Sequence, residues 1–178
     1  GTVLKRLKRI FVTALIIFIG FLLQFGVFAN SPFIGTVPNI LLIITVAFGF
    51  MNGKTQGMAV GFACGLLMDI ASMNAVGFHM AVFILIGYVN GVLHHWLYSD
   101  YILFPLIVTV FCSLFYGGYY YVFQFLVRNR LDFVYYLIHI ILPETVYTTV
   151  LTSIIYQTIS SINYRLEEAE RRSAAKFV

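Results

Sequence analysis

The chain has 178 residues, of which 61% are hydrophobic and only 10% are charged. A chain of this length with so little polar surface cannot enclose a soluble core, so the composition excludes a soluble globular protein and predicts a multi-span membrane protein. The net charge of +4 does not indicate nucleic-acid binding, because the basic residues lie at the ends of apolar segments. Membrane topology and anionic lipid account for basic residues in such places.

The first part of the chain contains three predicted spans. Residues 10–28 follow a basic stretch and are long enough to cross the hydrocarbon core. This segment is similar to a secretory signal, but it is longer than a signal core and five further apolar segments follow, so we expect it to be retained. A second span is predicted at 37–51, with Pro38 in its first turn, and a third at 55–71. Their short polar link predicts a helical hairpin, and their modest length requires local thinning of the bilayer or burial within the bundle.

The third span repeats glycine at every fourth position and ends on a carboxylate, as Gly53, Gly57, Gly61, Gly65 and Asp69. Residues four apart share one face of a helix, so these glycines form a groove that another helix backbone can approach closely. The fourth predicted span, 77–93, has its own pair, Gly87 and Gly91. The glycines either pack these two spans on each other or dock a helix of another protein, and the spacing alone leaves both uses open.

The fifth and sixth spans are predicted at 102–127 and 133–162. Tyrosines gather near the far end of the fifth span, where an aromatic belt at the membrane surface is expected, namely Tyr116, Tyr119, Tyr120 and Tyr121. Pro143 interrupts the sixth span and is expected to kink it. From residue 163 onward the chain is polar, with Glu and Arg at helical spacing. We therefore expect a membrane domain at 1–162 and a cytoplasmic helical tail at 163–178.

The distribution of basic residues predicts the orientation of this bundle. With six spans, nine Lys and Arg residues fall on the side of the two termini and only Arg128 and Arg130 fall on the other. Basic residues are concentrated on the cytoplasmic side of membrane proteins. The sequence therefore predicts an all-α polytopic bundle of six transmembrane helices with both termini in the cytoplasm.

A group of ionisable residues lies within the predicted spans, in their outer half: Asp69, His79, His139 and Glu144. Asn39 and Gln24 are candidate members of the same group. Intramembrane ionisable residues are costly unless they are paired, so we expect Asp69 to be protonated or hydrogen-bonded. The group is interpreted as a structural hydrogen-bonded cluster, as a contact site for a partner, or as part of a transport or catalytic path.

Sequence motifs of catalysis are absent from this chain. It has no phosphate-binding loop, no nucleophile elbow, no cluster of acids suited to a metal and no paired histidines at metal-ligand spacing. Cys64 and Cys112 lie inside apolar runs and are predicted to be small buried residues. We therefore predict no catalytic residue, no metal and no cofactor, and do not expect an enzyme.

Several of these segments resemble the rod shape-determining MreD family. The resemblance is carried by Pro38-Asn39-Ile40-Leu41-Leu42, by the run from Gly61 to Asp69 (GFACGLLMD), by Gly77 and by Ile86-Gly87-Tyr88. It covers most of the chain in the number of spans and the short length, and its motifs lie within residues 38–91. The residues assigned to helix packing or partner contact are Pro38, Asn39, Gly57, Gly61, Gly65, Gly87 and Gly91.

This resemblance implies a non-enzymatic scaffold subunit of the bacterial cell-elongation complex, in the cytoplasmic (inner) membrane. Proteins of the family associate with MreC, through its membrane span and the adjacent extracytoplasmic region. Through MreC they reach the filament protein MreB, the glycosyltransferase RodA and its transpeptidase. The family is also similar in fold to the substrate-binding S components of energy-coupling-factor vitamin transporters. A small-molecule-binding transport subunit is therefore the alternative function.

Overall fold

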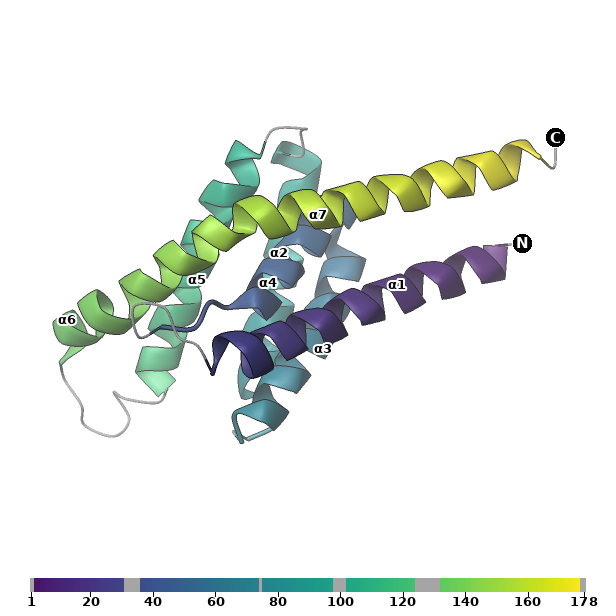
Figure 1. Ribbon diagram of the computed structural model, residues 1–178. Coiled ribbons are helices and arrows are strands. Elements are labelled where there is room, and N and C mark those ends of the chain that lie inside the picture. Colours follow the sequence, from purple (N-terminus) through teal and green to yellow (C-terminus); the bar gives the residue numbers. More distant parts are fainter. Residues whose placement is uncertain (1, 31–35, 74, 98–101, 124–131, 177–178) are drawn as a thin grey trace.

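The computed structural model describes residues 2–30, 36–73, 75–97, 102–123 and 132–176, and these form helices with no β-strand (Figure 1). The all-α prediction is confirmed, and each predicted span corresponds to a helix or a run of helices. The elements in chain order are α1 (Thr2–Leu22), η1 (Leu23–Phe28), α2 (Ile40–Asn52), α3 (Lys54–Ala71), α4 (Phe78–Leu97), α5 (Leu103–Tyr121), α6 (Phe133–Tyr136), η3 (Leu137–Ile141) and α7 (Leu142–Ala175).

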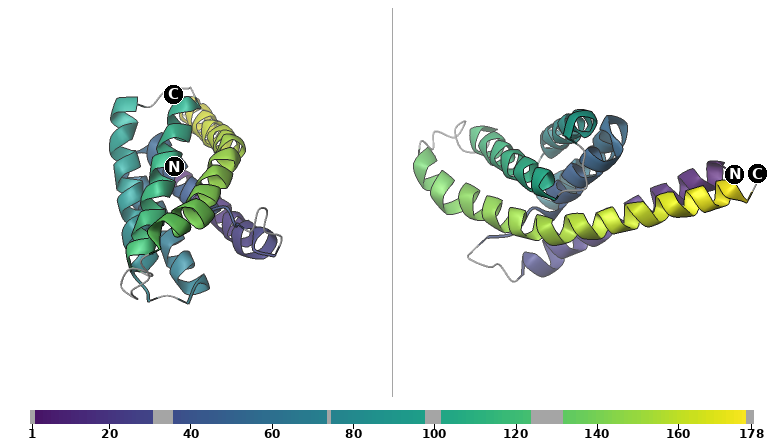
Figure 2. Two further views of the ribbon diagram at one scale, coloured as in Figure 1. Left: turned by 90° about the vertical axis from the view of Figure 1, so that its left-hand side faces the viewer. Right: turned by 90° about the horizontal axis from the view of Figure 1, so that it is seen from above.

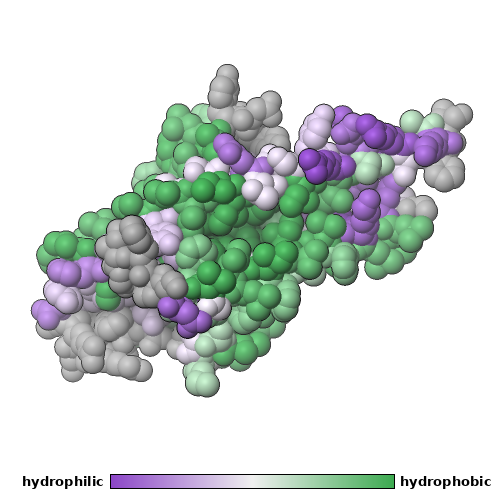
Figure 3. Space-filling model, in the orientation of Figure 1, coloured by the Kyte–Doolittle hydropathy of each residue, from purple (hydrophilic) through white to green (hydrophobic). Residues whose placement is uncertain are grey.

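Within the part of the chain that the structure describes, four helical stretches are long and apolar enough to cross a membrane: Thr2–Phe28, Phe78–Trp96, Leu103–Tyr121 and Phe133–Ala175. Hydrophobic side chains cover most of the face drawn in Figure 3, while hydrophilic residues gather over the ends of α1 and α7 that carry the termini. An apolar surface of this extent is stable only in contact with lipid or another apolar partner. The chain is therefore built as a membrane bundle.

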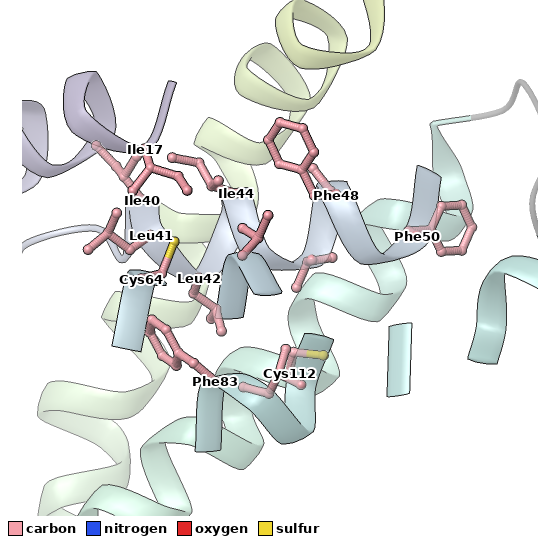
Figure 4. Close-up of a cluster of buried hydrophobic side chains, with 14 of the residues drawn as sticks. Ile17, Ile40, Leu41, Leu42, Ile44, Phe48, Phe50, Cys64, Phe83 and Cys112 are labelled. Atoms are coloured by element: carbon pink, nitrogen blue, oxygen red, sulfur yellow. The ribbon is translucent and has the colours of Figure 1, made fainter. Parts of the chain in front are cut away.

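Helix α2 forms the centre of the bundle. Every residue from Ile40 to Met51 is buried, and the side chains of α2 pack against α1, α3, α4 and α5 (Figure 4). Thirteen residues of α-helix span only about 20 Å, which is less than the roughly 30 Å of a hydrocarbon core. The short helix is accommodated by burial among its neighbours, as its length predicts. Cys64 and Cys112 are free thiols buried in the same core, as expected.

Helices α3 and α4 pack backbone to backbone through their glycines. A Cβ atom on Gly61 would collide with the carbonyl of Phe83, and Gly57 and Gly87 lie directly against each other. A Cβ on Gly65 would stand 2.5 Å from the Cα of Met80. Gly91 lies in the same way against the backbone of Lys54. Small residues allow this approach, which is a main source of helix association in lipid.

This contact decides which use of the glycine groove the structure supports. The face of α3 that carries Gly57, Gly61 and Gly65 is covered by α4 along its length. Another protein could dock on that face only if α3 and α4 separated. Of the two uses that the spacing left open, the structure therefore favours packing of α3 on α4.

The two termini lie at the same end of the molecule, where α1 and α7 run side by side (Figures 1 and 2). Arg9 binds the carboxylate of Glu170 through Nε and Nη2, each at 3.2 Å, and donates to Asn163 Oδ1 at 3.2 Å. Lys5 Nζ donates to the backbone carbonyl of Glu170 at 3.1 Å. Helix α1 begins eight residues before the predicted span, so its basic residues are helical and hold α7 in place.

Helix α7 runs without interruption from Leu142 to Ala175, so the polar tail continues the last apolar segment. The interruption expected at Pro143 takes the form of the π-helical turn η3, which ends two residues before the proline. Pro143 has no backbone N–H and cannot donate to a carbonyl of the preceding turn. The π-helical turn before it changes the hydrogen-bond pattern at this point, so the helix accommodates the missing donor. Near the C-terminal end, Arg172 pairs with Glu168 at 2.8 Å.

The glycine contact predicts a strong effect of a single methyl group. We expect Gly61→Ala to lower the free energy of unfolding by about 1–3 kcal/mol, because the added Cβ must push α4 away from α3. Thermal unfolding of the detergent-purified protein measures this change.

Gly118→Ala is the matched control, because a Cβ at Gly118 meets nothing within 4 Å. Replacing glycine by alanine in an open helical position is expected to stabilise by up to about 1 kcal/mol. A Gly61→Ala protein as stable as the Gly118→Ala protein would contradict the backbone contact.

Candidate functional site

Asp69 lies in the last turn of α3 and provides acceptors for the first amides of α4. Its side chain is fully buried. The two carboxylate oxygens accept from the backbone N–H groups of Gly77 at 2.9 Å, His79 at 2.8 Å and Met80 at 3.3 Å. The first amides of a helix have no partner within it, and a negative charge is favoured at that end. Asp69 therefore fixes the turn between α3 and α4.

His79 extends this contact toward α5. Its Nδ1 lies 2.9 Å from Asp69 Oδ1, and its Nε2 lies 3.0 Å from the hydroxyl of Tyr116. A carboxylate only accepts, so the neutral imidazole carries its proton on Nδ1, and Nε2 accepts from the Tyr116 hydroxyl. The chain from Asp69 to Tyr116 is buried throughout. It ties α3, α4 and α5 together at the end of the bundle remote from the termini.

The position of Tyr116 differs from the one expected for a member of an aromatic belt at the membrane surface. It is buried in the bundle, as is Tyr121, whereas the hydroxyl of Tyr119 donates to the carbonyl of Phe78 at 2.9 Å. Tyr116 lies on a buried face of α5 that recurs every three or four residues, namely Pro105, Val108, Thr109, Cys112, Ser113 and Tyr116. That periodicity was present in the sequence and identifies Tyr116 as an inward-facing residue.

The beginning of α2 is held by side chains from three other parts of the chain. The Asn39 side chain accepts from the N–H of Leu42 at 3.1 Å and caps the helix. Gln24, which the π-helical turn η1 directs inward, accepts from the N–H of Leu41 at 3.0 Å. The backbone N–H of Asn39 donates to Thr148 Oγ1 of α7 at 3.1 Å. Sequence reasoning missed Thr148, although it belongs to the buried threonine stripe Thr145, Thr148 and Thr152.

A cavity of about 400 Å³ lies beside these groups. It is bounded by η1 and Ala29, the segment before α2, the end of α3, α5, η3 and the start of α7. Its polar lining includes Gln24, Thr36, Asn39, Tyr116, His139 and Glu144. Figure 1 places η3 and the start of α7 at the end of the molecule remote from the termini. The cavity therefore lies toward that end of the molecule.

Two polar groups in the cavity wall have no partner among the described residues. The Asn39 side chain is only 2% exposed, and its Nδ2 makes no hydrogen bond. Glu144 lies in the first turn of α7 and is partly buried, and no hydrogen bond or ion pair engages it in the part of the chain that the structure describes. The buried Asn39 amide nitrogen is left unpaired at a cost in free energy, whereas the partly buried Glu144 carboxylate lines the cavity.

The four ionisable residues predicted to cluster are thus divided. Asp69 and His79 bind each other directly. Glu144 and His139 line the cavity, and Tyr116 is common to both groups. His139 is exposed, donates from Nδ1 to the backbone carbonyl of Tyr135 at 3.0 Å, and stacks on the Tyr135 ring with ring centroids 4.1 Å apart. Within the described residues, no three His, Cys, Asp or Glu side chains are placed to hold a metal ion.

The Asp69 contacts predict a graded response to substitution. We expect Asp69→Asn to lower the free energy of unfolding by about 1–2 kcal/mol, because one acceptor oxygen remains for the α4 amides. Asp69→Leu leaves all of its former donors without an acceptor and is expected to cost about 3 kcal/mol or more. Thermal unfolding in one detergent compares the two variants, and equal losses would argue against the capping role.

Comparison with known proteins adds a family assignment to this geometry. A family model described as rod shape-determining protein MreD matches residues 5–162, which include both the glycine contact and the cavity. No curated protein matches the chain. No solved structure matches it either.

Proposed function

The chain belongs to the MreD family of rod shape-determining membrane proteins, and we propose that it is a non-enzymatic scaffold subunit of the bacterial cell-elongation complex that binds MreC. In this function the chain holds a partner in place and carries out no chemical step itself. It acts in peptidoglycan synthesis through MreC, and through MreC it reaches MreB, RodA and its transpeptidase. Its location is the cytoplasmic membrane.

The observation that carries this proposal is the cavity with the Glu144 carboxylate in its wall. The small-residue face of α3 is covered by α4, so it offers nothing to a partner. The cavity instead presents the Glu144 carboxylate, which no hydrogen bond or ion pair of the described residues engages. A membrane-proximal segment of MreC, where its span leaves the bilayer, has the position needed to enter an outward-facing cavity. The bundle around the cavity is then the rigid frame that holds this segment.

We propose further that the bundle crosses the membrane six times, with both termini and the tail 163–178 in the cytoplasm. Nine of the eleven Lys and Arg residues then lie on the cytoplasmic side. The pairing of Arg9 with Glu170 supports a common side for the two termini. The cavity, at the remote end, then opens to the outer face of the membrane.

Cysteine labelling measures this topology. Val76 is 68% exposed at the turn before α4, and the native thiols Cys64 and Cys112 are buried. We expect Val76→Cys to react with a membrane-impermeant maleimide in right-side-out vesicles. Lys176→Cys is expected to react only in inside-out vesicles. Reaction of both variants in the same vesicle type would contradict the six-span arrangement.

Co-purification tests the binding of MreC. We expect the affinity-tagged chain, co-expressed with MreC, to retain it through detergent extraction. Ala29 lines the cavity, and Ala29→Trp is expected to reduce the recovered MreC at least several-fold, because the indole fills the space that the partner segment needs.

Ala14→Trp is the control for added bulk, because Ala14 is exposed on α1 outside the cavity lining. Failure of the unmodified chain to retain MreC would contradict the proposed function. Retention by Ala29→Trp equal to that of Ala14→Trp would remove the cavity as the docking place.

The cavity also favours a second candidate function, the small-molecule-binding S component of an energy-coupling-factor transporter. Its volume of about 400 Å³ lies within the range of small-molecule pockets. Recovery of an energy-coupling subunit in place of MreC in the same purification would favour this second function.

A further inference from the structure

We propose that residues 2–11, the first part of α1, form an amphipathic anchor that lies at the membrane surface and binds anionic phospholipid headgroups through Arg6 and Lys8. Such lipid binding goes beyond the proposed function and does not depend on MreC. Two features of this part of the helix carry the proposal. Its apolar and basic side chains are on different sides, and the apolar side runs on into the membrane-spanning part of α1.

The apolar side of residues 2–11 is left uncovered by the rest of the described chain. It consists of five large side chains that are each between 57% and 70% exposed, namely Val3, Leu4, Leu7, Ile10 and Phe11. Their spacing places all five on one face of the helix. A contiguous apolar face is unfavourable in water, so this face requires an apolar cover.

The membrane-spanning part of α1 continues this face without a break. Leu15, Phe18 and Leu22 follow Phe11 at steps of four, three and four residues, and they are between 46% and 55% exposed. In Figure 3 the hydrophobic surface reaches along α1 toward the end that carries the N-terminus. Lipid chains surround the apolar residues of a span. Because the face is continuous, the same lipid is the cover that fits its first part.

The basic residues of this segment divide into two pairs. Lys5 and Arg9 are turned toward α7, where both bind Glu170. Arg6 and Lys8 are exposed, and no hydrogen bond or ion pair of the described residues engages them. Successive residues of a helix are rotated by about 100°. Leu7 is central to the apolar face, so Arg6 and Lys8 emerge from the helix on opposite sides of that face.

The length of the helix brings this segment to the membrane surface. Together α1 and η1 have 27 residues, which rise about 40 Å, whereas the hydrocarbon core is roughly 30 Å thick. When the predicted span 10–28 fills the core, the excess lies at the N-terminal end of α1. Helices with an apolar face and flanking Lys or Arg lie in the interface.

The charge of Arg6 and Lys8 selects the headgroup. Their long side chains can keep the stems against apolar surface while the charged ends reach the lipid phosphates. Basic residues next to a membrane are attracted to anionic lipid. The ligand is therefore a phospholipid with a net negative headgroup, such as phosphatidylglycerol.

Spin-labelled lipids test the headgroup chemistry. The full chain, reconstituted in phosphatidylcholine vesicles at low salt, is expected to associate with spin-labelled phosphatidylglycerol in preference to spin-labelled phosphatidylcholine. Arg6→Gln/Lys8→Gln is expected to reduce this preference at least twofold. Arg171→Gln/Arg172→Gln removes the same charge from the exposed tail and is the control, which should keep the preference. An equal preference in the two double variants would overturn the proposed site.

The surroundings of Leu7 distinguish lipid from other covers. Cys64 and Cys112 are buried, so a nitroxide can be attached selectively to Leu7→Cys or to Lys176→Cys. In vesicles that contain phosphatidylglycerol, we expect the Leu7→Cys label to meet oxygen, which concentrates in lipid, more often than a water-soluble nickel chelate. The Lys176→Cys label should show the reverse.

Two results of this measurement would overturn the proposal. Equal access of the nickel chelate to both labels would place the apolar face in water. Protection of the Leu7→Cys label from both reagents would show a protein cover, such as a second copy of this chain.

The melting temperature separates lipid binding from a structural role. Arg6→Gln/Lys8→Gln should melt in detergent at the same temperature as the unmodified chain, because both side chains are exposed. A lower melting temperature would show that the two residues serve the fold and would contradict the proposal. All of these measurements use the chain alone, so their failure would leave the binding of MreC untouched.

Discussion

The structure depends on how the free backbone N–H groups at the beginning of α2 obtain hydrogen-bond acceptors. A helix that begins inside an apolar bundle has free amides with no water to accept from them, and each must find an acceptor within the protein. Here Gln24 and Asn39 supply side-chain oxygens, and Thr148 accepts from the backbone of Asn39. These acceptors come from η1, the segment before α2, and α7. Their positions fix where those elements lie around the central helix, and the space left between them is the cavity.

The bundle thus has a tightly packed side and an open side, and its polar residues differ accordingly. Between α3 and α4 the backbones touch through glycine, and Asp69 closes the turn with its oxygens occupied by four donors. That carboxylate is part of the fold. On the other side, Glu144 lies in a cavity wall with no described partner. Of these two acids, Asp69 is engaged within the fold and Glu144 lines the cavity.

The sequence contained enough information for the features that depend on spacing or on near neighbours. Glycine at every fourth position predicts the contact of α3 with α4, because helical periodicity is intrinsic, and Asp69 meets amides only eight to eleven residues away. The predicted span did not show that α1 begins eight residues earlier, because Lys and Arg count as polar in a search for spans although both favour helices. The state of Glu144 could not be predicted. It depends on which residues distant in sequence approach α7, as the pairing of Asn39 with Thr148 across 109 positions shows.

The long reach of α7 has a consequence for biogenesis. Ribosomes release the chain from its N-terminus, so α1 and α2 enter the membrane well before α7 exists. Until then Arg9 lacks the carboxylate of Glu170, 161 positions later, and the backbone of Asn39 lacks the hydroxyl of Thr148. Helix α2 therefore enters the membrane before all of its contacts with the rest of the bundle can form. Helix α7 supplies these missing contacts, so the bundle reaches its final form only after Thr148 and Glu170 have been synthesised.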